Sequence, residues 1–305
     1  IKMTNAYHGD TIGAVSAGGI DLFHSTYRDL LFPTFEVPYP YPYRFDGTAD
    51  DCVAHCLAVL DDILTVHADE VAALIVEPLV QGAAGMIMMP GGFLKALEQR
   101  CRDSGVLLIT DEVATGFGRT GRMFACEHED VRPDIMTLAK GLTGGYLPLA
   151  ATVTSEAIFE AFLGEYNEQK TFFHGHSYTG NQLCCAAALA SLELFETNNL
   201  LVRVNENHAT IREMLAEIAE CAHVGEVRNR GFMTGIELVR DRSTREPYAW
   251  QEQIGVKVCE RSRELGMIVR PLGHVVIFMP PLASTATELQ EMLRILHRSI
   301  SEVTE

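Results

Sequence analysis

An acid and an amine stand at the ends of two strand-like runs. Asp111 lies near the end of the apolar run VLLITDEV (106–113), and Lys140 follows the run DIMTLA (134–139). The carboxyl ends of parallel strands meet at the ligand-binding edge of an open α/β sheet, so we expect the two side chains to share one cleft. A lysine held in a cleft loses its charge more readily and becomes a nucleophile towards aldehydes. The pair indicates carbonyl–amine chemistry beside a fixed negative charge.

Each residue also has an ordinary structural explanation, since Asp111 could cap a strand and Lys140 could be a surface side chain. One cofactor accounts for both residues at once. Pyridoxal phosphate needs a lysine to hold its aldehyde and a carboxylate against its pyridine nitrogen, so that the protonated ring can act as an electron sink. It also needs an aromatic ring over its face and donors for its phosphate.

The same region contains a dinucleotide-binding pattern. Gly116, Gly118 and Gly121 spell GxGxxG directly after the Asp111 run. A nicotinamide loop requires a helix to open at these glycines, but Pro133 shortens any helix that follows. Asp111 and Glu112 would also place negative charge beside a pyrophosphate. An NAD-dependent dehydrogenase using residues 116–121 is therefore the alternative from another class, and we do not favour it.

Composition narrows the possible partners. The 305 residues carry a net charge of −17 and show no basic cluster, which argues against nucleic acid and anionic membranes. No apolar run reaches the ~18 residues of a membrane span. The eight cysteines form no CxxC pair, which is typical of reduced thiols and a cytoplasmic protein. His174, His176, Cys184 and Cys185 match no usual zinc spacing, so we expect no metal site.

The pattern along the chain predicts an α/β protein of two domains. Apolar strands are expected at 71–79, 106–113, 134–139 and 148–154, with a helix between the first two, which indicates a mostly parallel central sheet flanked by helices. After a long helix at 181–196 the pattern changes to a smaller α+β module. We therefore expect a large domain at 1–198 and a small C-terminal domain at 199–305. The proline-rich segment 35–47 is expected to be an extended surface excursion.

Several strings together resemble class III aminotransferases of fold type I, which use pyridoxal 5'-phosphate. They are YHGDT (7–11), EPLVQGAAGM (77–86), TDEVATGFGRTG (110–121), LAKGLTGGYLPLAA (138–151), HGHSYTGNQLCCAAALA (174–190) and RPLG followed by MPPL (270–282). They cover nearly the whole chain in the expected order. Because the chain opens at Ile1 in what looks like the middle of a domain, we expect the N-terminal part of the large domain, with the family's glycine-serine phosphate cup, to be missing.

The resemblance implies a role for each matching residue. Lys140 would hold the cofactor and shuttle the proton, and Asp111 would pair with the ring nitrogen. Tyr7 and Val113 would cover the two faces of the ring, Gln81 would contact the ring hydroxyl, and Tyr7 would also contact substrate. Glu77 would support the site, and Glu112 would be structural. Gly175, His176 and Ser177 would reach across a homodimer interface to the partner's cofactor phosphate and substrate. Arg270 would clamp the substrate carboxylate.

Within the family, HGHSYTGN and VRPLG followed by FMPPLAST resemble the Bacillus-type branch that aminates 8-amino-7-oxononanoate in biotin synthesis. The expected partners are thus a small amino donor and that keto acceptor. Ile277 stands where members that use S-adenosylmethionine carry a tyrosine, so the donor is either S-adenosylmethionine or lysine. A class III transaminase of the ω-amino-acid:pyruvate type, or an aminomutase on the same scaffold, is the alternative within the family.

Overall fold

Four strands form the central sheet, in the order β3 (Ala73–Val76), β6 (Leu107–Asp111), β7 (Ile135–Leu138) and β8 (Ala151–Thr154). The computed structural model describes residues 1–305. β3, β6 and β7 run parallel, and β8 is an antiparallel edge strand. All four lie within the ranges that apolar periodicity predicts. A mostly parallel sheet is thereby confirmed.

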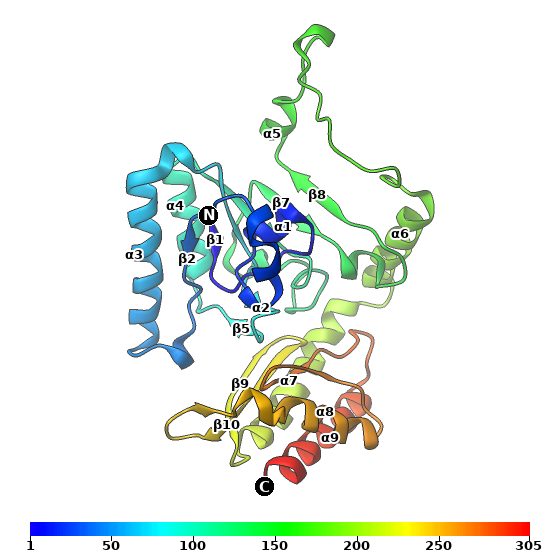
Figure 1. The fold of residues 1–305 in the computed structure, drawn as a ribbon. Helices are drawn as coiled ribbons and strands as arrows, with labels where there is room; N and C mark the ends of the chain where they lie inside the picture. The colour runs from blue at the N-terminus through cyan, green and yellow to red at the C-terminus, as the bar shows by residue number, and fades with distance from the viewer.

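Two helices cover one flank of this sheet. α4 (Phe93–Asp103) follows β3 and buries Phe93, Leu94, Leu97 and Cys101, the residues whose helical spacing predicts it. α3 (Ala49–His67) begins with a capping box at Thr48 and lies beside α4 in Figure 1. Arg100 Nε on α4 donates to Asp61 Oδ1 on α3 over 2.6 Å. Their apolar faces and the sheet enclose the first core.

The N-terminal residues complete this region. Here β1 (Lys2–Met3) pairs in parallel with β2 (Glu36–Val37), and the short helices α1 (Ile12–Ala17) and α2 (Asp21–His24) lie between them in the chain. The expectation that segment 35–47 is an extended surface excursion is wrong in part, because Pro42–Arg44 form a 3-10 turn and two other residues of the segment are buried. Val37 and Tyr39 are buried in the first core, because β1 lies against β3 and draws the paired β2 inward.

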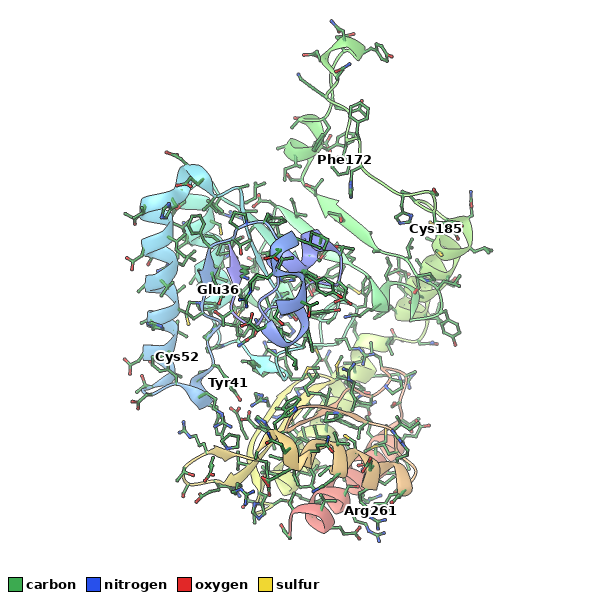
Figure 2. The ribbon with its side chains drawn as sticks, in the orientation of Figure 1. Glu36, Tyr41, Cys52, Phe172, Cys185 and Arg261 are labelled. Atoms are coloured by element: carbon green, nitrogen blue, oxygen red, sulfur yellow. The ribbon has the colours of Figure 1, made fainter.

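A long excursion leaves the sheet after β8. It contains α5 (Glu156–Glu160) and returns to α6 (Gln182–Thr197), and Figure 1 shows it projecting away from the rest of the chain. Phe172, labelled in Figure 2, lies on this projecting arm and is 60% exposed. Residues 155–180 are called the arm below.

The second packed region contains the remaining strands and helices. Its sheet runs β11 (Glu246–Pro247), β10 (Met233–Asp241), β13 (Val275–Phe278), β12 (Arg270–Leu272), with β9 (Val224–Arg230) also paired to β10, and all of these pairings are antiparallel. The covering helices are α7 (Leu200–Ala219), α8 (Ile254–Glu264) and α9 (Ala286–Thr304). α9 begins with a capping box, in which Thr285 and Glu288 bond reciprocally.

Two separate apolar cores lie on either side of the junction between α6 and α7. The first gathers buried residues from Met3 to Val131, and the second from Val204 to Ile300. Between the helices Asn199 adopts a left-handed φ of 47°. These observations support our proposal of a domain boundary near residue 198. None of the helices combines the length and the apolar character that a bilayer crossing requires.

Candidate active site

A cavity of about 1190 Å³ opens between the carboxyl end of the central sheet and the strands of the C-terminal region. Asp111 and Lys140 both line it, as do Tyr7, Val113 and Arg270. β6 and β7 are neighbours, with Asp111 opposite Thr137 in the register. Adjacent parallel strands thus deliver the acid and the amine to one edge of the sheet, as their positions in the sequence predict.

Asp111 is the last residue of β6 and is 6% exposed. Its Oδ1 accepts hydrogen bonds from Val113 N at 3.0 Å and Thr137 Oγ1 at 3.1 Å. Its Oδ2 lies 2.7 Å from His8 Nδ1. These contacts fix the carboxyl group at the cavity wall, where a carboxylate is placed to pair with a cationic group of a ligand.

Lys140 begins a 3-10 turn directly after β7 and has a left-handed φ of 47°, which a residue with a side chain rarely adopts. The turn is held by Gly145 N, which donates to the Lys140 carbonyl over 3.2 Å. Gly141 is required next to it, because a Cβ there would lie 2.7 Å from Phe117 Cβ. This constrained turn presents the exposed amine to the cavity.

Tyr7 and Glu77 form a second wall. The Tyr7 ring is stacked with His24 at a centroid distance of 6.2 Å, and its hydroxyl donates to Asp10 Oδ2 at 3.0 Å. Glu77 is 6% exposed and accepts from Tyr7 N at 3.2 Å and from Gly82 N at 2.9 Å. Glu77 thus ties the Tyr7 loop to the loop after Gln81, which is the supporting role that we expected.

Burial raises the pKa of Glu77 to about 7, and the nearby Asp111 carboxylate adds to this, against the opposing effects of His8 and the two N–H donors. In the unfolded chain Glu77 ionises near its ordinary value of 4.5. Between these values the folded protein holds a proton that the unfolded chain has lost. Protonation of Glu77 therefore adds to the free energy of unfolding. This contribution is fully present below pH 4.5 and is lost as pH rises through about 7.

We expect Glu77→Gln to remove this pH dependence. The free energy of unfolding of the native protein should fall, relative to that of the variant, by roughly 3 kcal/mol between pH 5 and pH 8. Urea unfolding at a series of pH values measures the difference. Glu213→Gln, at an exposed position on α7, is the control and should give no such trend. Parallel curves for the native protein and Glu77→Gln would contradict the prediction.

Two cavity residues were missed by reasoning from the sequence. His8, whose side chain is 3% exposed, contacts Asp111 Oδ2 and leaves its buried Nε2 without a hydrogen-bond partner. Its position directly after Tyr7 was the available signal. Arg119 lies in the glycine-rich loop and donates to the Pro280 carbonyl over 2.6 Å without an ion-pair partner. Burial lowers its pKa.

Arg270 opens β12 and lines the cavity with Leu272 and Ile277. Its backbone pairs with Ile277 across the strands. The guanidinium is exposed and forms no ion pair or side-chain hydrogen bond within the chain. This observation argues against a structural ion pair and leaves the five donors of Arg270 available to a ligand.

Four predicted site residues are not among those that line the cavity. Gln81 is buried in β4 (Val80–Gln81), which pairs with β5 (Ile87–Met88), and it donates to the Thr4 carbonyl at 2.8 Å. The β4–β5 hairpin turns the amide nitrogen of Gln81 towards β1, and its buried Oε1 has no hydrogen-bond partner within the chain. The contact of Gln81 with a ring hydroxyl stays a prediction. Gly175, His176 and Ser177 lie exposed on the arm, outside the cavity of their own chain.

The glycine pattern has a packing role. No α-helix opens at Gly116–Gly121, where turns lead instead to a 3-10 helix at Ala125–Glu129. A Cβ on Gly118 would lie 3.1 Å from Leu201 Cδ2, and one on Gly121 would lie 2.7 Å from Asn205 Oδ1. The glycines therefore let α7 approach the loop, and the dehydrogenase alternative loses its structural basis.

Glu112 faces away from the cavity and accepts hydrogen bonds from Thr115 Oγ1 and Cys126 N.

The cavity fits the ring of pyridoxal phosphate. A buried carboxylate, an amine in the turn after the neighbouring strand and a tyrosine line one space, which is the donor set that this cofactor requires. Gly82, Gly116 and Gly144 also line it and leave room for a planar group.

A family model and several relatives match this chain. The family model described as Aminotransferase class-III matches residues 1–300. Adenosylmethionine-8-amino-7-oxononanoate aminotransferases of Anoxybacillus flavithermus and Geobacter sulfurreducens are 54% and 53% identical to this chain, cover 100% of it, and are themselves covered over 67% and 68% of their length.

Two solved structures have the same fold. The adenosylmethionine-8-amino-7-oxononanoate aminotransferase of Methanocaldococcus jannaschii superposes with a TM-score of 0.92 at 43% identity, over 100% of this chain and 68% of that one. A PLP-bound amine transaminase from an uncultivated Pseudomonas species gives 0.93 at 36% identity, over 99% and 69%. Fold type I, which the strings predict, is confirmed. The chain belongs to the class-III aminotransferases.

Proposed function

We propose that this aminotransferase transfers an amino group to 8-amino-7-oxononanoate to give 7,8-diaminononanoate, a step of biotin synthesis. The observation that carries the proposal is the meeting of Asp111 and Lys140 in one cavity with Arg270. The names of the relatives that are 54% and 53% identical support the acceptor. The reaction has two halves, in which a donor loses its amino group and the acceptor then gains one.

The cofactor of this proposal is pyridoxal 5'-phosphate, which supplies an aldehyde that condenses with amines and a protonated ring that withdraws electrons. Asp111 would face the ring nitrogen and keep it protonated by its negative charge, and His8 holds the carboxyl group in place. The Lys140 amine would hold the aldehyde and would serve as the base that moves a proton at the substrate carbon. Tyr7 and Val113 would cover the two faces of the ring and exclude water.

Arg270 is our candidate for the acceptor's carboxylate, because its planar fork suits bidentate capture and no residue of the chain competes for it. We expect Arg270→Ala to raise KM for the keto acceptor roughly 100-fold, the cost of a lost charged hydrogen bond, with little effect on cofactor binding. Steady-state kinetics and cofactor titration measure the two effects. Arg263→Ala, at an exposed position on α8, is the control. Equal damage to both measurements would mean that Arg270 holds the fold.

A homodimer is part of the proposal. The arm and α6 expose large apolar side chains, including Tyr166 at 100%, Phe173 at 81% and Leu183 at 74%. His176 and Ser177 lie between Phe173 and Leu183 in the chain and offer a ring and a hydroxyl to an anion. We infer that a second copy covers this surface and receives these groups at its cofactor phosphate.

The eight free cysteines support a reducing, cytoplasmic location.

The amino donor is S-adenosylmethionine or lysine. Ile277 is 7% exposed and lines the cavity, where an aliphatic side chain offers no hydrogen bond to a donor. The test of the function is a product assay with full-length protein, pyridoxal phosphate and 8-amino-7-oxononanoate, run with each donor in turn. Formation of 7,8-diaminononanoate with either donor supports the proposal. Turnover of ω-amino acids with pyruvate, and none with the aminated nonanoate, would favour the alternative within the family.

A further inference from the structure

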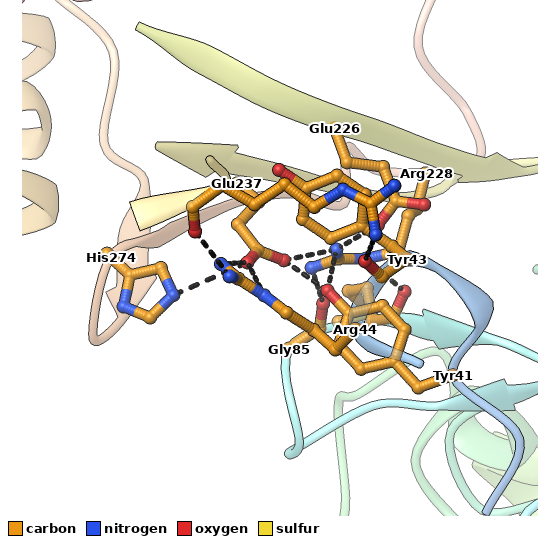
Figure 3. Close-up of polar contacts among 10 residues, drawn as sticks. Tyr41, Tyr43, Arg44, Gly85, Glu226, Arg228, Glu237 and His274 are labelled. Carbon is orange, nitrogen blue, oxygen red and sulfur yellow. Dashed lines mark hydrogen bonds and ion pairs between the residues drawn. The ribbon is translucent and has the colours of Figure 1, made fainter. Parts of the chain in front are cut away.

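A buried arginine connects the C-terminal strands with the loop that forms one wall of the cavity. Arg228 lies in β9, is 5% exposed, and donates from Nη2 to the Gly85 carbonyl at 2.8 Å and from Nε to the Met86 carbonyl at 3.2 Å. Figure 3 shows its third nitrogen among Glu226, Glu237 and the Tyr41 hydroxyl. The one guanidinium therefore contacts two consecutive carbonyls and a set of acids at once.

The acids in this group make the burial of the charge possible. Glu237 is 2% exposed and also accepts from Arg44, and His274 Nε2 lies 3.6 Å from its Oε1. Burial alone would raise the pKa of Glu237, but its contacts with His274 and Tyr41 and the charge and hydrogen bond of Arg228 hold that pKa far below its usual range. Tyr41 and Arg44 belong to the N-terminal region, and Figure 2 shows Tyr41 at the junction of the two regions. This cluster of charged side chains thus connects the N-terminal region with the C-terminal strands.

The loop that Arg228 holds has a constrained backbone. Gly85 has φ 110° and Met86 has φ 55°, and both N–H groups donate to the Gly82 carbonyl, at 3.1 and 3.0 Å. β10 lies directly against it, because a Cβ on Gly235 would be 2.8 Å from the Gly85 oxygen. A left-handed Met86 persists only where neighbouring groups fix it.

The same contacts relate this loop to Arg270. Gly82, Ala83 and Met86 line the cavity on one side. Gly235 is paired with Ile277, and Ile277 is paired with Arg270. The loop therefore rests on the strand layer that carries the candidate carboxylate clamp, and Arg228 fastens the two together.

We propose that Arg228 is a positioning residue that fixes the Gly82–Met86 loop against the strands carrying Arg270, and so sets the width of the acceptor site between Met86 and Arg270. The effect on the acceptor rests on the proposed function, whereas the fixing of the loop does not. A lysine could keep the charge beside Glu237, but one ammonium cannot reproduce the planar fork that reaches both carbonyls.

The test compares Arg228→Lys with Arg44→Lys in full-length holoenzyme. Arg44 bonds the same Glu237 but makes no hydrogen bond to Gly85 or Met86. For Arg228→Lys we expect amide hydrogen exchange at Gly85 and Met86 to rise about 10-fold and KM for the acceptor to rise by a similar factor, with kcat less affected. Arg44→Lys should lower the melting temperature but leave both readouts near the native values.

Equal effects of the two variants on exchange and on KM would overturn the proposal. Tyr41→Phe is used if Arg228→Lys does not fold, since it removes a partner of Nη1 and so loosens the hold on the guanidinium whose other two nitrogens bond the carbonyls of Gly85 and Met86. It should raise exchange at Gly85 about 3-fold, and unchanged exchange would overturn the proposal as well. If the native enzyme does not turn over 8-amino-7-oxononanoate, the proposed function fails, and the exchange comparison still decides the role of Arg228.

Discussion

Lys140→Ala should reduce turnover by roughly 10⁴-fold or more, the upper end of what a positioned acid–base group contributes, because the same amine both bonds the cofactor and moves the proton. Alanine supplies neither function, and no other lysine lines the cavity. Both half-reactions should fail together. Stopped-flow absorbance with each substrate measures them, and borohydride treatment should fix cofactor to the peptide that contains residue 140 only in the native enzyme.

Lys257→Ala is the matched control, since Lys257 is exposed on α8 and does not line the cavity. It should leave turnover unchanged. Added methylamine should restore part of the activity of Lys140→Ala, because a free amine can take over the proton transfer. Turnover of Lys140→Ala near the native level would remove the basis of the proposed function.

The sequence predicts the central sheet and the main site well, and the reason is physical. Apolar periodicity identifies β3, β6 and β7, and parallel strands bring their carboxyl ends together. Asp111 and Lys140 could therefore be placed at one edge from their positions after these runs. Arg270 could be placed because family resemblance marks it, and the antiparallel β12–β13 pair carries it to the cavity.

Contacts between segments that are far apart in the chain could not be predicted from the sequence. His8 meets Asp111 across 103 residues, and Arg228 meets Gly85 across 143. Neither pair leaves a local pattern, because each depends on how the N-terminal loop and the C-terminal sheet dock on the first core. The direction of the Gln81 side chain could not be predicted for a related reason, since in a two-residue strand it depends on the hairpin register and not on composition. Val37 and Tyr39 are buried through the pairing of β2 with β1.

Asp111→Asn should lower kcat by at least about 10² to 10³-fold, which is the usual cost of removing one preorganised electrostatic contact at a reacting centre. The amide keeps the shape of the side chain and can still accept from Val113 N and Thr137 Oγ1. What it loses is the negative charge, without which the ring nitrogen is no longer held in its protonated form. Cofactor should still bind through Lys140, so the loss should fall mainly on kcat. Kinetics and the absorbance spectrum of bound cofactor measure the two effects.

Glu112→Gln is the control, because Glu112 is the adjacent acid on the same chain segment but points to Thr115 and Cys126. Burial raises the pKa of Glu112, so loss of a negative charge is tolerated there, but glutamine can accept only one of the two hydrogen bonds. That variant should alter stability and leave kcat within about 3-fold of the native value. The reverse result, with Asp111→Asn active and Glu112→Gln inactive, would show that Glu112 and not Asp111 supplies the charge at the ring. It would also leave His8, whose Nδ1 lies 2.7 Å from Asp111, without a role in the reaction.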